Sequence, residues 1–294
     1  MRIDAFSQPE LSILQQVRAL ERVCQAHDLL KGSLFLDPSL NFSPEIASLL
    51  VCYEGDLLIG AMTLFAPTRD EVELVSLTHP DFRRRGVFRA LLSAAAEQAS
   101  AFAIPDLLLI CEKQSRDGVS ALAALGGGHP EYSEYALSYG ADSCPDNLPV
   151  PEGLSLFPAT EADLDDMARI SAASFDEPAS QARRFLEQAL QSENRTQYIA
   201  RFLGEPIGIG GIGYEEDAAT IFGLAVHPDW QGRGIGRGMI ALLLKEMLTR
   251  NKANILIEVN SANAAALHLY LSCGFVSTVT NGYYRFPVTK FSQK

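Results

Sequence analysis

An internal repeat constrains the fold of this chain more than any other feature. The tripeptide His79-Pro80-Asp81 recurs as His227-Pro228-Asp229, 148 residues later, and six of the eleven residues from 79 to 89 are identical at that offset. A repeat of about half the chain is too long for a solenoid unit, so it predicts two tandem domains, residues 1–147 and 148–294. The proline-rich segment Cys144–Pro151 is the predicted linker between them.

The second repeat contains a glycine-rich turn between an apolar strand and an amphipathic helix. Alternate glycines let the backbone turn tightly and point several N–H donors into one concavity, where a helix N-terminus adds positive partial charge. This pattern predicts a cradle for a pyrophosphate group. Arg233 and Arg237 lie four residues apart and would add charge-assisted hydrogen bonds from one side if the helix has begun by Arg233. The alternative is an exposed turn with incidental glycines.

Two other nucleotide-binding motifs are excluded. Gly208, Gly210 and Gly213 have the spacing of a dinucleotide fingerprint, but they lie in a strand pattern that acidic residues follow, where the fingerprint requires a helix. We interpret them as strand glycines that another backbone or a ligand approaches. A Gly-Lys pair, which a P-loop requires, does not occur in the sequence.

The charge of the chain argues against a nucleic-acid partner. The formal net charge is −12, and residues 1–150 carry 11 Lys and Arg against 20 Asp and Glu. Binding to a phosphate backbone needs a basic footprint, which neither half offers. An acidic surface would attract cationic substrates such as amines, although it also simply aids solubility.

The cysteines and the N-terminus indicate a cytoplasmic protein. Five scattered cysteines without a C-x-x-C pair argue against a disulfide framework or a zinc site, so no metal is expected. The N-terminus has no apolar signal core, and no run reaches the roughly 18 apolar residues of a membrane-spanning helix.

Hydrophobic periodicity predicts alternating helices and strands in both repeats. A helix is expected over residues 9–27, and a hairpin turned by Glu54-Gly55-Asp56 follows. In the second repeat, Thr160–Asp163 has the pattern of a capping box. Two final strands, 275–279 and 283–286, are expected to form a hairpin turned by Asn281-Gly282.

Three segments of the second repeat resemble the hallmarks of the GNAT N-acetyltransferase superfamily. Gln231-x-x-Gly234-x-Gly236 is similar to the family's acyl-coenzyme-A signature, Phe222–Pro228 to its bulged central strand, and Ile257–Phe275 to its second hallmark. The resemblance is strong over residues 153–290 and weak over 1–143. It implies an α/β fold of two tandem GNAT-like domains, each a mixed, mostly antiparallel sheet flanked by helices and splayed at the bulge.

The resemblance also implies a binding site for acetyl-CoA as the acyl donor. Carried over to this sequence, it assigns Tyr270 as the general acid that protonates the departing thiolate, and Asn263 as a contact of the pantetheine arm. These two residues are seven apart, so they project from one face of a helix. A core aromatic is the alternative role for Tyr270. The remaining cofactor-binding residues that the resemblance implies are Leu224, Ala225, Val226, Gln231, Gly232, Arg233, Gly234, Ile235, Gly236 and Arg237.

The general base is not defined by the sequence. Some family members have a carboxylate midway along the bulged strand, where this chain has Thr220. Other carboxylates nearby are the turn residues 215–217 and Glu258, which is placed in an apolar strand and can have a structural partner instead. A water-mediated base, or an acceptor that arrives partly neutral, remains open. His227 is interpreted as the residue before a turn-setting proline.

The first repeat departs from the family pattern at two positions. Phe88 stands where the second cradle glycine would be, and Ala124 is expected at the position of the tyrosine. We interpret this half as a degenerate domain with a structural or substrate-shaping role. The run Arg83–Arg85 could still bind phosphate or form a solvated basic turn.

These observations predict a tandem N-acetyltransferase that transfers an acetyl group from acetyl-CoA to a primary amine in its C-terminal domain. The acceptor is a small-molecule amine, or the N-terminus or a lysine of a protein, and the fold alone cannot choose between them. The alternative is a non-catalytic acyl-CoA sensor or partner-binding module. Neither a nucleic acid nor a membrane is an expected partner, and the sequence leaves the oligomeric state open.

Overall fold

The computed structural model describes residues 1–126, 129–140, 148–215 and 217–291. The chain forms two compact units, the first made of Met1–Glu134 with Val279–Lys294 and the second of Tyr135–Thr278. The end of the chain therefore belongs to the first unit, which the sequence repeat did not predict. Half of the predicted linker, residues 144–147, lies outside the described residues, and the domain boundary at residue 147 stays a prediction about the repeat.

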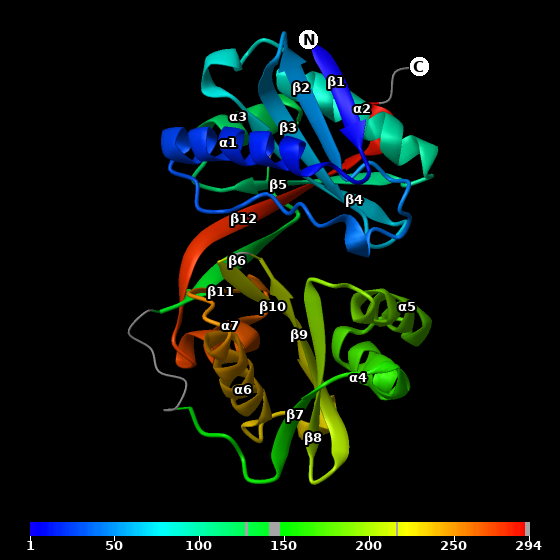
Figure 1. The fold of residues 1–294 in the computed structure, drawn as a ribbon, viewed down its shortest axis with the longest axis vertical. Helices are drawn as coiled ribbons and strands as arrows, with labels where there is room; N and C mark the ends of the chain where they lie inside the picture. Colours follow the sequence, from blue (N-terminus) through cyan, green and yellow to red (C-terminus); the bar gives the residue numbers. More distant parts are fainter. Residues whose placement is uncertain (127–128, 141–147, 216, 292–294) are drawn as a thin grey trace. The chain divides into compact units, whose positions relative to one another are not determined.

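The first unit is built on a mixed sheet (Figure 1). Its strands follow the order β1-β2-β3-β4-β5-β12, antiparallel except for the parallel pair β4–β5. The elements are β1 (Arg2–Phe6), α1 (Leu11–Asp28), β2 (Leu49–Glu54), β3 (Leu57–Phe65), β4 (Glu71–Thr78), α2 (Val87–Ala101), β5 (Asp106–Glu112), α3 (Arg116–Ala124), the start of β6 (Tyr132–Tyr139) and most of β12 (Phe275–Pro287). Short 3-10 turns, η1 (Pro38–Leu40), η2 (Pro80–Phe82) and η6 (Val288–Lys290), complete it.

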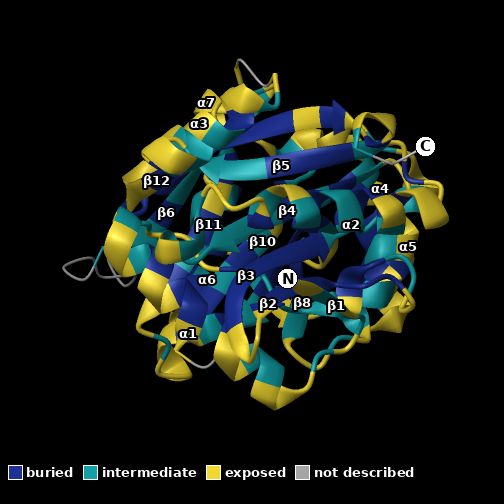
Figure 2. Ribbon diagram, turned by 90° about the horizontal axis from the view of Figure 1, so that it is seen from above, coloured by how far each residue is buried: buried dark blue, intermediate teal, exposed yellow. Residues whose placement is uncertain are grey.

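Helices cover both faces of this sheet. On one face Leu91 and Leu92 of α2 pack in the same core as Ile59 and Met62 of β3. On the other face α1 buries its apolar stripe, including Val17, against the alternate residues of β2 and β3. Figure 2 shows β3 buried along most of its length, which explains why the strand is almost entirely apolar.

The second unit has the same plan. Its sheet order is β7-β8-β9-β10-β11-β6, with β10 and β11 parallel and β7 to β10 antiparallel neighbours. The elements are β7 (Leu154–Pro158), η4 (Glu161–Asp163), α4 (Leu164–Phe175), α5 (Ala179–Leu190), β8 (Arg195–Phe202), β9 (Glu205–Tyr214), β10 (Ala218–Val226), η5 (Pro228–Trp230), α6 (Ile235–Thr249), β11 (Asn254–Asn260) and α7 (Ala264–Ser272). The predicted fold class, an α/β arrangement with a mixed and mostly antiparallel sheet, is confirmed.

The helices of the second unit also lie on opposite faces of its sheet. The stripe of α6 that includes Leu243 and Met247 packs on one face, with Tyr198 and Ile212. Helices α4 and α5 pack on the other face, where Ile209 and Ala225 are buried. The capping box at the start of this helical region is confirmed, since the main-chain N–H of Thr160 donates to Asp163 Oδ2 at 2.9 Å.

The predicted C-terminal hairpin is wrong. Residues 275–287 form one strand, β12, and Asn281 and Gly282 pair in register with Glu112 and Cys111 of β5. Asn-Gly favours a turn only when the flanking strands pair with each other, and here β5 offers a longer ladder. Strands β1 and β6 were not predicted either.

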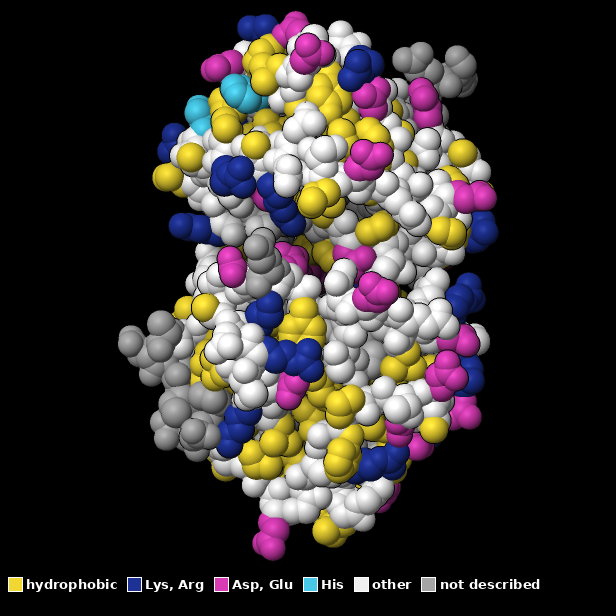
Figure 3. Space-filling view, viewed as in Figure 1, with side chains coloured by type: hydrophobic (Ala, Val, Ile, Leu, Met, Phe, Trp, Pro, Cys, Tyr) yellow, Lys and Arg dark blue, Asp and Glu magenta, His cyan; other side chains and the backbone are white. Residues whose placement is uncertain are grey.

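None of the helices in the described ranges is long and apolar enough to cross a membrane. On the face drawn in Figure 3, positive and negative side chains are interspersed over the surface.

Candidate active site

Strand β10 carries a bulge at its centre. Ala225 pairs with Ile209 and Phe222 pairs with Gly211, so Gly223 and Leu224 together stand opposite the single residue Gly210. Gly223 has a φ of 57°, in the left-handed region that favours glycine. The bulged central strand that the resemblance implied is therefore present.

Strands β10 and β11 also separate at this point. Their parallel ladder runs from Ala218 to Ile221, and within the described residues no pair between them follows. The backbone of β10 from Phe222 onwards is therefore unpaired on its β11 side, next to the bulge. This opening leaves main-chain donors and acceptors free for an extended ligand.

The glycine-rich turn that follows has the conformation of an anion cradle. Gly232 and Gly234 have φ values of 74° and 76°, and the N–H of Gly238 makes the first intrahelical bond of α6, to the Gly234 carbonyl at 3.0 Å. For the N–H groups of residues 232–237, the described part of the protein contains no recorded acceptor. These donors and the start of α6 fit the pyrophosphate of acetyl-CoA.

Hydrogen bonds from the turn and from α4 meet at the last residue of β10. The carbonyl of Val226 accepts a hydrogen bond from Gln231 Nε2 at 3.0 Å and another from Ser174 Oγ at 3.3 Å. His227 Nδ1 accepts from the N–H of Asp229 at 3.4 Å, so His227 caps η5, as its place before a proline suggested.

The two arginines of the turn point in different directions. Arg233 lies before α6, which begins at Ile235; its Nη2 donates to the Asp229 carbonyl at 3.0 Å, and its guanidinium carbon lies 4.8 Å from the centre of the Trp230 ring. Arg237 Nη2 donates to Ser272 Oγ of α7 at 3.0 Å. The two arginines were expected on one side of the helix only if it had begun by Arg233, and it begins two residues later.

The last two glycines of the motif serve packing. A Cβ at Gly236 would lie 3.1 Å from Leu269 of α7, and one at Gly238 would lie 2.6 Å from Leu154 of β7. The first turn of α6 thus approaches its neighbours more closely than a larger residue would allow.

Helix α7 supplies the predicted polar residues of the second hallmark. Asn263 caps the helix, because its Oδ1 accepts from the N–H of Ala266 at 3.0 Å. Tyr270 is 6% exposed and packs within the core beneath α6. Burial, with a smaller contribution from nearby Cys273, raises the pKa of Tyr270 to about 12, so its hydroxyl stays protonated at neutral pH.

The carboxylates considered as a general base are on the surface. Glu215, Asp217 and Glu258 are exposed, and Glu216 lies outside the described residues. Thr220 pairs with Gly213 and Leu256 in the sheet, upstream of the bulge. The exposure of the described carboxylates therefore does not single out one of them as a base.

The first unit keeps the turn. Arg84 and Gly86 have φ values of 61° and 87° at the positions of Gly232 and Gly234. Arg83 Nε donates to the Thr78 carbonyl at 3.2 Å, the counterpart of the bond from Gln231 to Val226. Arg83 also pairs with Asp28 and, at 2.8 Å, with Asp117, so its guanidinium is engaged within the protein, whereas Arg84 and Arg85 of the same run are exposed.

The first unit lacks the bulge. The ladder between β3 and β4 runs without a break from Gly60 opposite Thr78 to Phe65 opposite Glu73. Pairing with the parallel neighbour ends at Leu74 in β4 and at Ile221 in β10. From that point to the end of the strand, at Thr78 and at Val226, β4 has one residue fewer than β10. The parallel ladder of β4 with β5 also ends early, at Leu74, so the first unit has the separation of these strands without the bulge.

The position equivalent to Tyr270 needs correction. Ser115 caps α3 by accepting from the N–H of Gly118, as Asn263 caps α7. Counting from these caps places Leu122, 3% exposed, and not Ala124, opposite Tyr270. Either residue lacks a proton to donate.

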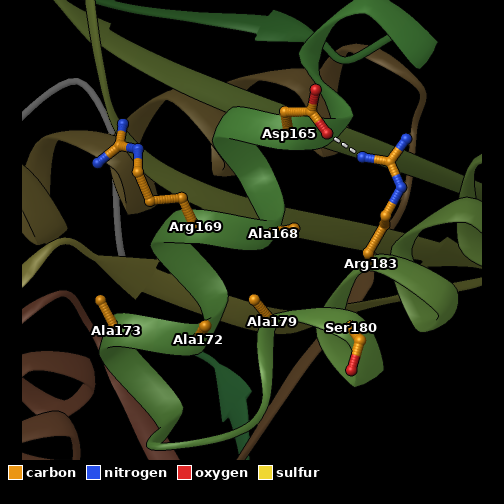
Figure 4. Close-up of a pocket in the computed structure, with 8 residues that line it drawn as sticks. All are labelled: Asp165, Ala168, Arg169, Ala172, Ala173, Ala179, Ser180 and Arg183. Carbon is orange, nitrogen blue, oxygen red and sulfur yellow. Dashed lines mark hydrogen bonds and ion pairs between the residues drawn. The ribbon is translucent and has the colours of Figure 1, made fainter.

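A groove of about 530 Å³ lies between α4 and α5 of the second unit (Figure 4). Its floor consists mainly of small side chains, Ala168, Ala172, Ala173 and Ala179, and the ion pair between Asp165 and Arg183 crosses from one helix to the other. None of the residues assigned to the donor site lines it.

Residues 164–275 match the acetyltransferase (GNAT) family. This part of the chain, which includes the bulge, the turn and α7, is a domain of that family. The chain is 45% identical over 69 residues to the [ribosomal protein bS18]-alanine N-acetyltransferase of Salmonella typhimurium, covering 23% of this chain and 47% of the relative. The chain thus spans about half the length of the first curated relatives that it matches.

A longer match connects the chain with a mycothiol acetyltransferase of Clavibacter michiganensis, at 28% identity over 73% of this chain and 72% of the relative. Two solved structures share the fold over almost the whole chain. A GCN5-related N-acetyltransferase from Sphaerobacter thermophilus has a TM-score of 0.77 at 15% identity, covering 98% of this chain and 95% of the other. A tandem GNAT protein from the clavulanic acid biosynthesis pathway has a TM-score of 0.70 at 19% identity, covering 98% and 99%.

Proposed function

We propose that this protein is an acetyl-CoA-dependent N-acetyltransferase whose chemistry takes place in the second unit. One observation carries the proposal: the bulged, splayed end of β10 leads directly into a turn whose free N–H groups open the N-terminus of α6. The first unit has the turn without the bulge, so we assign it a structural or substrate-shaping role.

The donor would lie along this surface. Acetyl-CoA supplies the acetyl group as a thioester. The N–H groups of residues 232–237 bind its pyrophosphate, with Gln231 fixing the turn, and the backbone of Leu224, Ala225 and Val226 binds the pantetheine arm and polarises the thioester carbonyl. Asn263 keeps its Nδ2 for the arm, because its Oδ1 is engaged in the helix cap.

Tyr270 would act as the general acid. Its raised pKa keeps the proton on the hydroxyl until the departing sulfur, whose thiol has an ordinary pKa near ~8.5, develops negative charge. For Tyr270 the described protein contains no recorded hydrogen-bond partner, so a hydrogen bond to the sulfur does not compete with one inside the protein.

The acceptor is a primary amine. One relative is named as an alanine N-acetyltransferase of a ribosomal protein and another as a mycothiol acetyltransferase, so both a protein amine and a small-molecule amine are candidates. The four described cysteines, Cys24, Cys52, Cys111 and Cys273, are free thiols, which supports a reducing compartment such as the cytoplasm.

A non-catalytic acyl-CoA sensor is the second candidate, favoured by the exposure of the described carboxylates that we considered as a base. Calorimetric titration with acetyl-CoA tests the donor site, and we expect one strong site per chain. Release of free thiol in the presence of an amine panel tests turnover. Binding without thiol release from any amine would establish the sensor, and two equal sites would show that the first unit also binds the donor.

A further inference from the structure

Glu177 is a half-buried carboxylate at the C-terminal end of α4. Its Oε1 accepts a hydrogen bond of 2.7 Å from the hydroxyl of Ser171, which is only 6% exposed. Asp176 ends the helix with a φ of 53° and turns the chain back, so the next residue reaches a serine six positions earlier. The carboxylate of Glu177 is therefore fixed against the end of the helix and stays partly accessible.

The charge of Glu177 is not neutralised within the protein. Among the described residues, none forms an ion pair with Glu177, and the last turn of α4 contains no basic side chain. The last carbonyls of a helix carry negative partial charge, which disfavours a carboxylate at that end. Both the carboxylate and the helix end would therefore stabilise a positively charged ligand at this position.

Helix α4 crosses the sheet towards the bulged strand. Its start is tied to β8, because Arg201 donates to Asp163 Oδ1 at 2.7 Å. Its last turn is tied to β10, because Ser174 Oγ donates to the Val226 carbonyl at 3.3 Å. The next strand after β10 in this direction is β11, from which β10 has separated beyond Ile221. The end of α4 thus stands beside the opening of the proposed donor site.

The two serines connect Glu177 with this opening. Ser171 and Ser174 are three residues apart, so they lie on one side of α4, about 4.5 Å apart along its axis. One holds Glu177, and the other bonds the last residue of β10. The bulge itself is accessible, since Gly223 is exposed and a Cβ placed on it would meet no other part of the described protein within 4 Å. A ligand can therefore reach both the bulge and the carboxylate.

We propose that Glu177 binds the ammonium group of the acceptor and so places the amine beside the bulge of β10. This inference rests on the proposed acetyl transfer, which supplies the position of the thioester. Amines are mostly protonated at neutral pH, so the acceptor arrives as a cation and forms a charge-assisted hydrogen bond with the carboxylate. Ser171 engages Oε1 and leaves Oε2 for the acceptor, which makes Ser171 a positioning residue.

The test compares amines with alcohols of the same shape. The pairs are L-alaninamide with L-lactamide and benzylamine with benzyl alcohol, in which a hydroxyl replaces the ammonium group. Their dissociation constants are measured at neutral pH by ligand-observed NMR on the protein saturated with coenzyme A. We expect the wild type to bind at least one amine about tenfold more tightly than its alcohol, because a charge-assisted hydrogen bond is stronger than a neutral one.

Glu177→Gln should lose this preference for the amine, because it keeps the shape of the side chain and removes the charge. Asp176→Asn is the matched control, since it makes the same change of charge one residue away at an exposed position. It should keep the preference, and asparagine also adopts the left-handed conformation. Ser171→Ala should weaken the preference in part.

Three results of the NMR titrations would overturn the proposal. They are a wild type without preference for either amine, a preference that persists in Glu177→Gln, and a preference that Asp176→Asn loses to the same extent. The last result would mean that the general acidity of the surface attracts the amine.

Melting temperature separates binding from a structural role. The amide oxygen of Glu177→Gln can still accept from Ser171, and the charge at the helix end is removed, so its melting temperature should equal or exceed that of the wild type. Glu177→Met repeats the titrations if the glutamine variant does not unfold cooperatively. A clear fall in the melting temperature of both variants would show that the charge stabilises the fold, which contradicts the proposal.

Thiol release from acetyl-CoA distinguishes this proposal from the proposed function. Turnover of amines with the same KM in the wild type and Glu177→Gln would refute the role of Glu177 and leave the acetyltransferase assignment standing. A preference for amines that depends on Glu177, without thiol release from any amine, would support the ammonium site and refute the assignment.

Discussion

Gln231 and Val226 are joined by a hydrogen bond of 3.0 Å from the side-chain Nε2 to the main-chain carbonyl. The first unit has the same bond from a different side chain, since Arg83 Nε donates to the Thr78 carbonyl at 3.2 Å. In both units the bond closes the path from the end of a strand to the start of a helix. The position of the N–H groups of the turn therefore depends on this hydrogen bond, and either glutamine or arginine can supply it.

Gln231→Ala should weaken acetyl-CoA binding by about five- to tenfold, because one hydrogen bond contributes roughly 1 kcal/mol and the turn would lose its preferred position. Gln231→Arg is the matched control, since arginine makes this bond in the first unit. Calorimetric dissociation constants of the three proteins test the expectation. Equal affinity in the alanine variant and the wild type would show that Ser174, which bonds the same carbonyl, suffices alone.

Two glycines of the motif should respond differently to alanine. Gly232 has a φ of 74° with no atom near the added Cβ, so Gly232→Ala should cost about 1–2 kcal/mol of backbone strain and weaken acetyl-CoA binding. At Gly238 the added Cβ would meet Leu154 and Pro151 at 2.6 and 2.7 Å, so Gly238→Ala should lower stability chiefly by overpacking.

Urea unfolding and calorimetry distinguish these two effects. For an equal loss of unfolding free energy, acetyl-CoA affinity should fall more in Gly232→Ala than in Gly238→Ala. Gly232→Asn serves as the control, since asparagine adopts the left-handed conformation more readily than alanine. The reverse order of affinities would mean that packing of α6, and not the shape of the turn, governs the donor site.

The features that the sequence predicted correctly are local ones. The turn, the caps and the helical stripe of the second repeat depend on residues within a few positions of one another, such as Gly234 and Asn263. The errors depend on distant partners. Asn281-Gly282 extends a strand because β5, more than 150 residues earlier, pairs with it. Pairing with so distant a strand leaves no pattern in the residues around Asn281-Gly282 from which it could be predicted.

The loss of the bulge in the first unit has a signal in the sequence, although a weak one. The segment from Leu74 to Thr78 in the first repeat is one residue shorter than the segment from Ile221 to Val226 in the second. An alignment at constant offset hides this difference.

Phe286 should report the contribution of β12 to the first unit. It is 4% exposed and belongs to the core beneath α2, so Phe286→Ala should cost about 3–5 kcal/mol. The sole tryptophan of the chain, Trp230, lies in the second unit. We therefore expect the urea unfolding curve of Phe286→Ala, followed by circular dichroism, to show an additional transition at lower urea concentration. The emission of Trp230 should not change in that transition.

Phe157→Ala, at a position 51% exposed on β7, is the control and should change stability little. If Trp230 emission and circular dichroism shift together in Phe286→Ala, the two units unfold as one cooperative body.

Tyr270 gives a prediction for the pH dependence of turnover. Burial raises its pKa to about 12, above the ordinary value near ~10, so the acid form persists across the range in which an exposed tyrosine would ionise. The proton is lost only as the pH rises through the folded-state value. The kcat of the wild type should therefore not decline between about pH 8 and 10.5, where the acceptor amine becomes increasingly neutral.

Tyr270→Phe should lower kcat by about 10²- to 10⁴-fold and leave the acetyl-CoA dissociation constant within a few-fold, because the ring still packs in the core and only the proton donor is removed. Tyr214→Phe, a partly buried tyrosine of β9 in the same unit, is the matched control and should retain the wild-type rate. A Tyr270→Phe variant with the kcat and pH profile of the wild type would assign Tyr270 to the core alone, and the departing thiolate would then take its proton from water.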